Sequence, residues 1–372
     1  MKIAIIRQRY SPHGGAEKFI SRALAALSSD EVQVSLIARD WEAVERIDFH
    51  RCDPFYIGRI WRDWGFAKHA CQALTSLEID LVQSHERIGC CDIYRAGDGV
   101  HREWLKQRSR VLSRPKKLAQ TLSPYHHYLK SAEKKLFEGT RLRAVICNSK
   151  MVKKEIQHYF QISNEKLHVI YSGVDVKRYH PELKHYRSEF RSLHHIPQDA
   201  TLYAFVGSGF FRKGLEQVLK AMACLDQRCY LIIAGYDKQQ KYYEKLANRL
   251  GLEKRTLFLG SVKDVKPCYG AADVFVLPTL YDPFPNAVLE AFATGLPVIT
   301  SEKSGAAEVI EQGHNGYVCD ALDVTSLTHY MCSLQDRKLA YNMGEQARRT
   351  AEKFEMNHMV NKLTQLYQRL EQ

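Results

Sequence analysis

The sequence alternates short apolar runs with segments of helical period, and it does so twice. In the first half the runs predict strands at Ile3–Ile6, Val32–Ile37, Asp80–Gln83, Ile93–Arg95 and Ala144–Cys147. After a segment at 171–198 with little periodicity, the alternation starts again, with predicted strands at Leu202–Val206, Tyr230–Ala234, Leu257–Leu259, Val274–Leu277 and Pro297–Thr300. This pattern is typical of parallel sheets with crossover helices. The sequence therefore predicts an α/β protein with two doubly wound domains.

A length of 372 residues is enough for two α/β domains with separate cores. We expect an N-terminal domain over 1–172, a C-terminal domain over 173–354 and a final helical segment over 355–372. Doubly wound domains bind ligands outside the carboxyl ends of their strands. We therefore predict a ligand site in a cleft between the two sheets.

The segment Asp282–Gly295 (DPFPNAVLEAFATG) follows an apolar strand and has the features of a ligand site. Its Pro and Gly residues suit the start and the end of a helix. The backbone N–H groups of Asn286 and Ala287 would lie at the positive end of this helix, where they can hold an anion. Glu290 lies one turn further along, where its carboxylate can accept hydrogen bonds from two vicinal hydroxyls. A capped helix with an exposed glutamate is the alternative, but the loop acid Asp282 favours function.

Two glycine-containing turns provide further candidates. The segment VGSGFFRKG at 206–214 follows a strand. It is not a dinucleotide-binding loop, because Arg212 replaces the third Gly, and it is not a Walker A loop, because Lys213 precedes Gly214 and no Ser or Thr follows. It delivers Arg212 and Lys213, whose charges suit a diphosphate, although a solvated basic turn is the alternative. In the turn after the first strand, Gly14 and Gly15 permit a ligand to approach the backbone closely.

The segment after the predicted strand Ile93–Arg95 contains a candidate for the acceptor side. Asp98 lies between two glycines, which leave its carboxylate exposed and able to orient a hydroxyl nucleophile. A turn-forming Asp is the alternative. His85 and His101 compete for the acceptor role, and we predict Asp98 first and His101 second.

The spacing of Asp282 and Glu290 resembles the E-x7-E motif of family 4 glycosyltransferases, which are retaining enzymes of the GT-B fold with two Rossmann-like domains. The resemblance implies that Glu290 binds the nucleotide ribose and that Asp282, where the family more often has Glu, contacts the donor sugar. It implies that Lys213 stabilises the leaving nucleoside diphosphate, with Arg212 sharing that charge.

Other parts of the chain carry the same resemblance. It implies that Gly14 and Gly15 lie near the donor phosphates, that the turn with Gly305 lies under the transferring sugar, and that a helix at about Glu355–Leu370 crosses back to the first domain. The turn containing Asp98 is similar to that of the glucosyltransferases of lipopolysaccharide core assembly, closest to the heptose α-1,3-glucosyltransferase type.

The net charge of +12 is concentrated in the segment 101–143, which holds twelve Lys or Arg residues and three acids. Leucine and aromatic residues are interleaved with these charges, which suits an anionic membrane surface or a phosphorylated acceptor. A solvated helix face is one alternative; nucleic-acid binding is another, but no nucleic-acid motif accompanies the charges.

The N-terminus is typical of a buried strand rather than a signal peptide, and no stretch is apolar enough to span a bilayer. We therefore expect a cytoplasmic protein, peripheral on the inner leaflet of the inner membrane, with no nucleic-acid partner.

The ten cysteines are interpreted as reduced thiols. Cys71 and several others lie in apolar patterns, and the adjacent Cys90 and Cys91 have no second pair with which to form a zinc site.

The chain contains no D-x-D pair of the kind that holds a divalent metal on a diphosphate. We therefore expect no metal and no cofactor apart from the nucleotide-sugar co-substrate.

We predict that the chain transfers a hexose, glucose from UDP-glucose, with retention of configuration. The acceptor would be a lipid-linked or phosphorylated sugar of lipopolysaccharide core or a related cell-surface glycan. Transfer from UDP-N-acetylglucosamine, UDP-galactose or a GDP-sugar, for O-antigen or capsule, is one alternative. A non-catalytic nucleotide-sugar or nucleic-acid binding protein is the alternative from another class.

Overall fold

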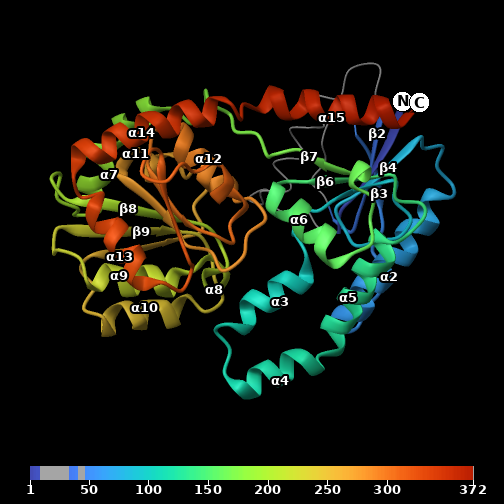
Figure 1. Ribbon diagram of the computed structural model, residues 1–372, viewed down its shortest axis with the longest axis horizontal. Helices are drawn as coiled ribbons and strands as arrows, with labels where there is room; N and C mark the ends of the chain where they lie inside the picture. The colour runs from blue at the N-terminus through green and yellow to red at the C-terminus, as the bar shows by residue number, and fades with distance from the viewer. Residues whose placement is uncertain (9–32, 41–46, 372) are drawn as a thin grey trace. The chain divides into compact units, whose positions relative to one another are not determined.

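The computed structural model describes residues 1–8, 33–40 and 47–371, which form two compact units (Figure 1). Unit 1 comprises Met1–Tyr171 and Met359–Gln372, and unit 2 comprises Ser172–His358. The loop with Gly14 and Gly15 lies outside the described residues.

Within its described residues, unit 1 contains a seven-stranded parallel sheet with the strand order β3-β2-β1-β4-β5-β6-β7. Its strands are β1 (Lys2–Ile6), β2 (Gln33–Ala38), β3 (Ile47–Arg51), β4 (Leu81–Ser84), β5 (Ile93–Arg95), β6 (Ala144–Cys147) and β7 (Leu167–Val169). Its helices are α2 (Gly58–Leu74), α3 (His101–Ser109), α4 (Arg114–Leu122), α5 (Pro124–Phe137), α6 (Lys150–Tyr159) and α15 (Met356–Glu371). The central strands β4, β5 and β6 are buried along their whole length, and β1 and β6 consist of apolar residues apart from Lys2.

Unit 2, which is described throughout, contains a six-stranded parallel sheet with the order β10-β9-β8-β11-β12-β13. Its strands are β8 (Thr201–Val206), β9 (Cys229–Ala234), β10 (Thr256–Gly260), β11 (Val274–Leu277), β12 (Val298–Ser301) and β13 (Gly316–Cys319). Its α-helices are α7 (Arg187–Leu193), α8 (Phe210–Lys213), α9 (Leu215–Ala223), α10 (Gln240–Arg249), α11 (Lys266–Ala271), α12 (Asn286–Ala293), α13 (Val324–Ser333) and α14 (Arg337–Glu352). Helices α9, α10 and α13 cover one face of the sheet, and α7, α11, α12 and α14 cover the other (Figure 1).

The prediction of two doubly wound domains is confirmed, and the ten predicted strands are present. Strands β3, β7 and β13 were not predicted. All three are short; β3 and β7 form the two edges of the first sheet, and β13 forms one edge of the second. No residue of β3 is fully buried, and its sequence, IDFHR, contains no apolar run from which a strand could be predicted.

The order of the strands in each sheet reverses at one position. In unit 1 the reversal lies between β1 and β4, and in unit 2 between β8 and β11. The crevice beyond the carboxyl ends of such a strand pair is where doubly wound sheets bind ligands. The two reversals therefore indicate where to look for a site in each unit.

Helix α15 belongs to unit 1 from Met359 onward, although unit 2 precedes it in the chain. Met359, Leu363, Leu366 and Leu370 are buried and recur at helical spacing along one face. The hydroxyl of Tyr367, on the same helix, donates to Gln83 Oε1 on β4 at 2.7 Å. The helix thus covers the sheet of unit 1.

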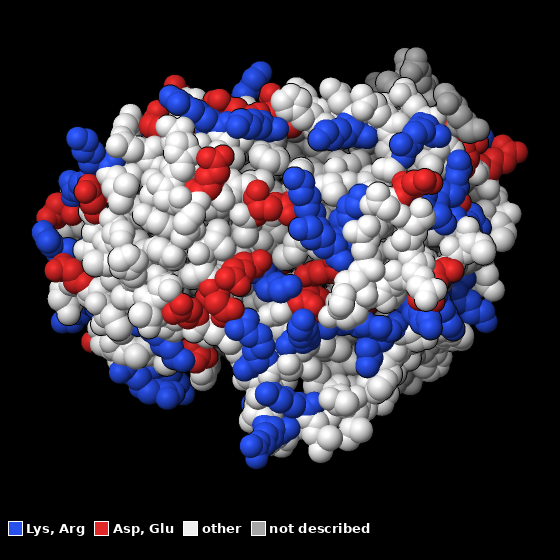
Figure 2. All heavy atoms as spheres, in the orientation of Figure 1, with Lys and Arg blue, Asp and Glu red and all other residues white. Residues whose placement is uncertain are grey.

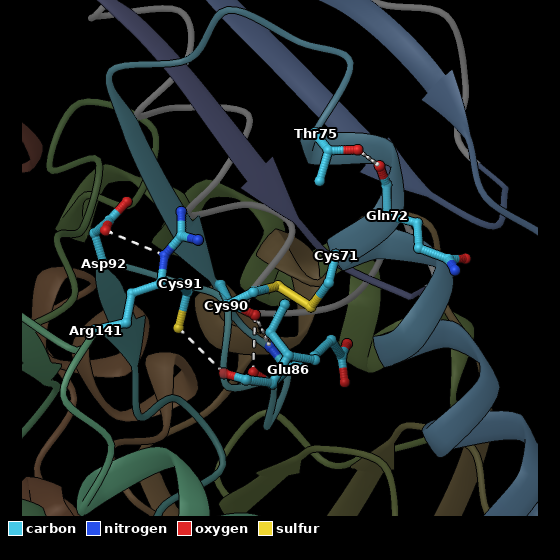
Figure 3. The surroundings of a disulfide bond; sticks show 10 residues. Cys71, Gln72, Thr75, Glu86, Cys90, Cys91, Asp92 and Arg141 are labelled. Atoms are coloured by element: carbon cyan, nitrogen blue, oxygen red, sulfur yellow. Dashed lines mark hydrogen bonds and ion pairs between the residues drawn. A yellow bond between two sulfur atoms is a disulfide. The ribbon is translucent and has the colours of Figure 1, made fainter.

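The interpretation that all the cysteines are reduced is wrong for one pair. Cys71 on α2 and Cys90, between β4 and β5, form a disulfide (Figure 3). Their Cα atoms lie 5.8 Å apart although 19 residues separate them. The tertiary fold creates this proximity, whereas the sequence shows only that Cys90 adjoins Cys91. Cys91 remains a free, buried thiol, which donates to the carbonyl of Ile88.

Reduction of this disulfide is expected to lower the free energy of unfolding by about 3 kcal/mol, because the bond closes a loop of intermediate length in the unfolded chain. Urea unfolding with and without reductant measures the difference. The Cys71→Ser variant is the control, since its stability should not respond to reductant. Thiol titration of the denatured protein, purified without reductant, should find the eight free cysteines. Ten titratable thiols would contradict the disulfide.

Candidate active site

The loop after β8 is held in one conformation by its glycines. Gly209 and Gly214 adopt φ values of 80° and 79°, which favour glycine, and they flank the single turn of α8. A Cβ atom at Gly214 would lie 2.0 Å from the carbonyl oxygen of Pro278, just beyond β11. The loop therefore packs directly against the end of the neighbouring strand and presents Arg212 and Lys213 there.

The predicted cations and the predicted loop acid meet at this position. Arg212 Nη1 and Lys213 Nζ both donate to Asp282 Oδ2, at 2.8 and 2.5 Å. Lys213 and Asp282 are buried. Burial alone would raise the pKa of Asp282, but the charges of Lys213 and Arg212 outweigh it and hold that pKa below its usual value. The backbone N–H of Gly305 donates to the carbonyl of Asp282 at 2.8 Å, so the predicted turn with Gly305 adjoins the same loop.

Helix α12 begins beside this loop. Asn286 and Ala287 form its first turn, and the residue before them, Pro285, has no side chain that can cap the helix. Backbone N–H groups in the first turn of a helix have no partner within the helix, and the dipole makes this end positive. The start of α12 is therefore a positive helix end, which suits an anionic group.

Glu290 is buried, with an exposed fraction of 8%. This burial excludes the alternative of a solvent-exposed glutamate on a capped helix. The hydroxyl of Tyr269, on α11, donates to Glu290 Oε2 at 3.0 Å. Burial and the charge of Glu290 raise the pKa of Tyr269 well above its usual value, so the phenol stays a proton donor. No pattern in the sequence connects Tyr269 with Glu290, and this contact was not predicted.

On the side of unit 1, Asp98 lies in the turn after β5 and lines a pocket of about 330 Å³. The two histidines do not line that pocket. His101 Nε2 is 3.1 Å from His126 Nδ1, and burial, with the nearby charge of Arg87, lowers the pKa of His101 to about 3. His85 is buried, and its Nε2 lies 3.1 Å from the side-chain nitrogen of Gln83. Of the three acceptor candidates, Asp98 is the one that lines this pocket among the described residues.

The structure thus gathers the predicted donor-side residues of unit 2 around the carboxyl ends of β8 and β11. These are Arg212, Lys213, Asp282, Asn286, Ala287, Glu290 and Gly305. Gly14 and Gly15 lie outside the described residues. A cationic pair, a positive helix end and a buried carboxylate on one side of a sheet suit a ligand with a diphosphate and vicinal hydroxyls.

Comparison with known proteins places both halves of the chain in one enzyme class. Residues 13–178 match the family model "Glycosyltransferase Family 4", and residues 187–350 match the model "Glycosyl transferases group 1". An uncharacterised glycosyltransferase of Methanocaldococcus jannaschii is 34% identical over 177 residues, which is 46% of this chain and 45% of that protein. The lipopolysaccharide glucosyltransferase WaaG of Escherichia coli is 25% identical over 328 residues, covering 86% of this chain and 85% of WaaG.

Solved structures show the same fold. The crystal structure of WaaG, a glycosyltransferase involved in lipopolysaccharide biosynthesis, matches 98% of this chain and 99% of WaaG, with a TM-score of 0.86 and 20% identity. The structure of HepE from Anabaena in complex with UDP-glucose matches 99% of each chain, with a TM-score of 0.75 and 20% identity.

Proposed function

The chain belongs to the family 4 glycosyltransferases with the GT-B fold, and on this basis we propose that it transfers glucose from UDP-glucose with retention of configuration. The acceptor is a lipid-linked or phosphorylated sugar in lipopolysaccharide core or a related surface glycan. The observation that carries the proposal is the contact of Arg212 and Lys213 with Asp282 beside the start of α12.

In this proposal the two cations and the first turn of α12 hold the diphosphate of the donor. Asp282 keeps Arg212 and Lys213 in place before the donor arrives, and the diphosphate then shares these cations with it. When the bond between the anomeric carbon and the phosphate oxygen breaks, negative charge develops on that oxygen. Fixed positive groups stabilise this charge without having to reorganise. The same groups supply the compensating charge without a metal ion.

The sugar and the ribose have separate partners in the proposed complex. Glu290, oriented by Tyr269, accepts hydrogen bonds from the ribose hydroxyls. Asp282 contacts the transferring sugar, next to the turn with Gly305. Buried acceptors of this kind reject ligands that lack the matching hydroxyl, because the carboxylate would lose its partner.

The acceptor side of the proposal includes the membrane. Lys and Arg side chains gather over α3 and α4, at the bottom of Figure 2. Helix α4 has no buried residue, and Leu118 and Leu122 are exposed on it. Basic residues with exposed leucines suit a surface of anionic lipids. Among the described residues, no helix is long and apolar enough to cross a membrane. We propose that these basic residues and leucines attach the enzyme, as a peripheral protein, to the cytoplasmic leaflet of the inner membrane.

A thermal-shift panel tests the donor. UDP-glucose, UDP-galactose, UDP-N-acetylglucosamine and a GDP-sugar are each added at the same concentration to the full chain. The true donor should raise the melting temperature most, since a ligand present at about 100 times its Kd stabilises by about 2.7 kcal/mol. A larger shift with another nucleotide-sugar would replace UDP-glucose in the proposal. If no nucleotide-sugar produces a shift, donor binding itself is refuted.

A further inference from the structure

The two cations of the candidate donor site, Arg212 and Lys213, lie on a single helical turn. Helix α8 comprises four residues, Phe210–Lys213, between two glycines with positive φ. Isolated helices of this length are unstable in water, and tertiary packing supplies most of the stability of helices in proteins. The position of the two cations therefore depends on contacts that reach α8 from other parts of unit 2.

A carboxylate from the loop after β9 holds the start of α8. Asp237 Oδ2 accepts a hydrogen bond from the backbone N–H of Phe210 at 2.7 Å, and Asp237 Oδ1 accepts from the backbone N–H of Gln239 at 2.7 Å. The same loop accepts a further bond, from the backbone N–H of Gly209 to the carbonyl of Tyr236 at 3.2 Å. Asp237 thus provides a partner for an N–H group at a helix start, where the helix itself provides none.

The loop after β11 holds the other end of α8. The carbonyl oxygen of Arg212 accepts two hydrogen bonds at 2.8 Å, from the hydroxyl of Thr279 and from the backbone N–H of Leu280. Thr279 is fully buried, and its own carbonyl accepts from the hydroxyl of Ser301, the last residue of β12. The end of the turn is therefore fixed to two neighbouring strands of the sheet.

The aromatic ring of Phe210 anchors the turn between these two attachments. The ring is fully buried and packs edge-to-face against Phe205 on β8 and Tyr243 on α10, with centroid distances of 6.0 and 5.4 Å. Because this anchor remains when one hydrogen bond is lost, we expect the turn to persist in such a variant. Arg212 and Lys213 would then be held less closely in position.

We infer that Asp237 and Thr279 are positioning residues of the donor site, which hold the turn of α8 so that its two cations are in place before the diphosphate binds. Neither side chain has to touch the donor to do this. Preorganised charges bind an anionic group without a cost of reorganisation, so less ordered cations should bind a diphosphate less tightly. The inference rests on the proposed function, in which these cations bind the diphosphate, and it adds two residues from outside the segments that predicted the site.

Calorimetry on the full chain tests this inference without requiring turnover. The probes are UDP and GDP, and the variants are compared with the one that binds the wild type more tightly. Asp237→Ala should lower that affinity by about fivefold, the loss typical of a helix cap. Asp237→Asn keeps an oxygen that can accept from Phe210, so its affinity should be close to that of the wild type. Thr279→Val should weaken binding, and Thr279→Ser, which keeps the hydroxyl, should restore it.

Two variants elsewhere in unit 2 are the matched controls, Asp226→Ala and Thr328→Val. Asp226 Oδ1 accepts from the backbone N–H of Arg228 at 2.8 Å, in the turn before β9, and the hydroxyl of Thr328 donates to the carbonyl of Val324 on α13 at 2.7 Å. Each control loses a hydrogen bond of the same kind as the variant it matches. Both controls should bind the nucleoside diphosphate as the wild type does.

A double-mutant cycle with Lys213→Ala separates positioning from a general loss of stability. If Asp237 acts through the cations, Asp237→Ala should cost less affinity in the Lys213→Ala background than in the wild type. The inference is overturned if the cost is the same in both backgrounds, or if Asp237→Ala and Thr279→Val bind as tightly as their controls. If Asp237→Ala is too unstable to purify, the two Thr279 variants decide. A wild type that binds neither UDP nor GDP would refute the proposed function, and the inference with it.

Discussion

Replacement of Lys213 by alanine is expected to lower the rate of sugar transfer by about 10²- to 10³-fold, the cost of losing one preorganised group at a developing oxyanion. Lys213 is buried next to Asp282, and its ammonium group lies where the proposal puts the leaving diphosphate. The rate is measured as UDP release from UDP-glucose at saturating donor. Because Arg212 still donates to Asp282 in this variant, the loop should keep its fold, which its melting temperature will show.

Two controls isolate the charge of Lys213. Lys213→Met keeps the apolar stem and should lose as much activity as the alanine variant. Lys220→Ala removes a surface lysine whose ion pair with Glu216 is exposed, and it should be fully active. If Lys213→Ala released UDP at the wild-type rate, the chain would not use this lysine for catalysis. A non-catalytic nucleotide-sugar binding protein would then be the better description.

Replacement of Glu290 by glutamine is expected to raise the KM for UDP-glucose by about 10- to 100-fold, because hydrogen bonds to a charged group contribute about 1.5–3 kcal/mol. The change is nearly isosteric, so Tyr269 can stay in place, although its hydroxyl now meets an amide. Steady-state kinetics over a wide range of donor concentrations measures the effect. The rate at saturation should change much less than KM, since the ribose is remote from the reacting bond.

The comparison of UDP with dUDP gives this prediction a sharper form. The wild type should bind UDP more tightly than dUDP, which lacks one ribose hydroxyl. In Glu290→Gln the ratio of the affinities for UDP and dUDP should approach one, because the carboxylate that accepts a hydrogen bond from the ribose hydroxyl is absent. An equal loss of affinity for both nucleotides would show that Glu290 supports the fold of α12 rather than binding the ribose.

Much of the fold could be predicted because it depends on local patterns. Apolar runs such as that of β11 are buried on both faces and therefore appear as uninterrupted hydrophobic sequence. The place of the proposed donor-side residues beyond the end of a strand could be predicted for a related reason. Asp282 and Glu290 are close in the chain and flank one helix start, so their spacing carries the information.

The features that were missed depend on contacts between distant parts of the chain. Lys213 and Asp282 are 69 residues apart, and their direct hydrogen bond follows from the adjacency of β8 and β11. Tyr269 reaches Glu290 from a separate helix in the same way. The contact of the His101 ring with His126 was not predicted either, because the position of His101 near Asp98 in the sequence does not show which side chain its ring contacts.

The place of α15 in unit 1 has a consequence for how the protein is made. Unit 1 is discontinuous: the ribosome produces all of Ser172–His358 before the residues from Met359 that cover the first sheet. Domains generally fold as units, N-terminal first, during synthesis. Here unit 2 can be complete before the hydrogen bond from the hydroxyl of Tyr367 to Gln83 has formed. Unit 1, whose synthesis begins first, would therefore complete its fold after unit 2. Until α15 has been made, the face of the first sheet that this helix covers would be exposed to chaperones.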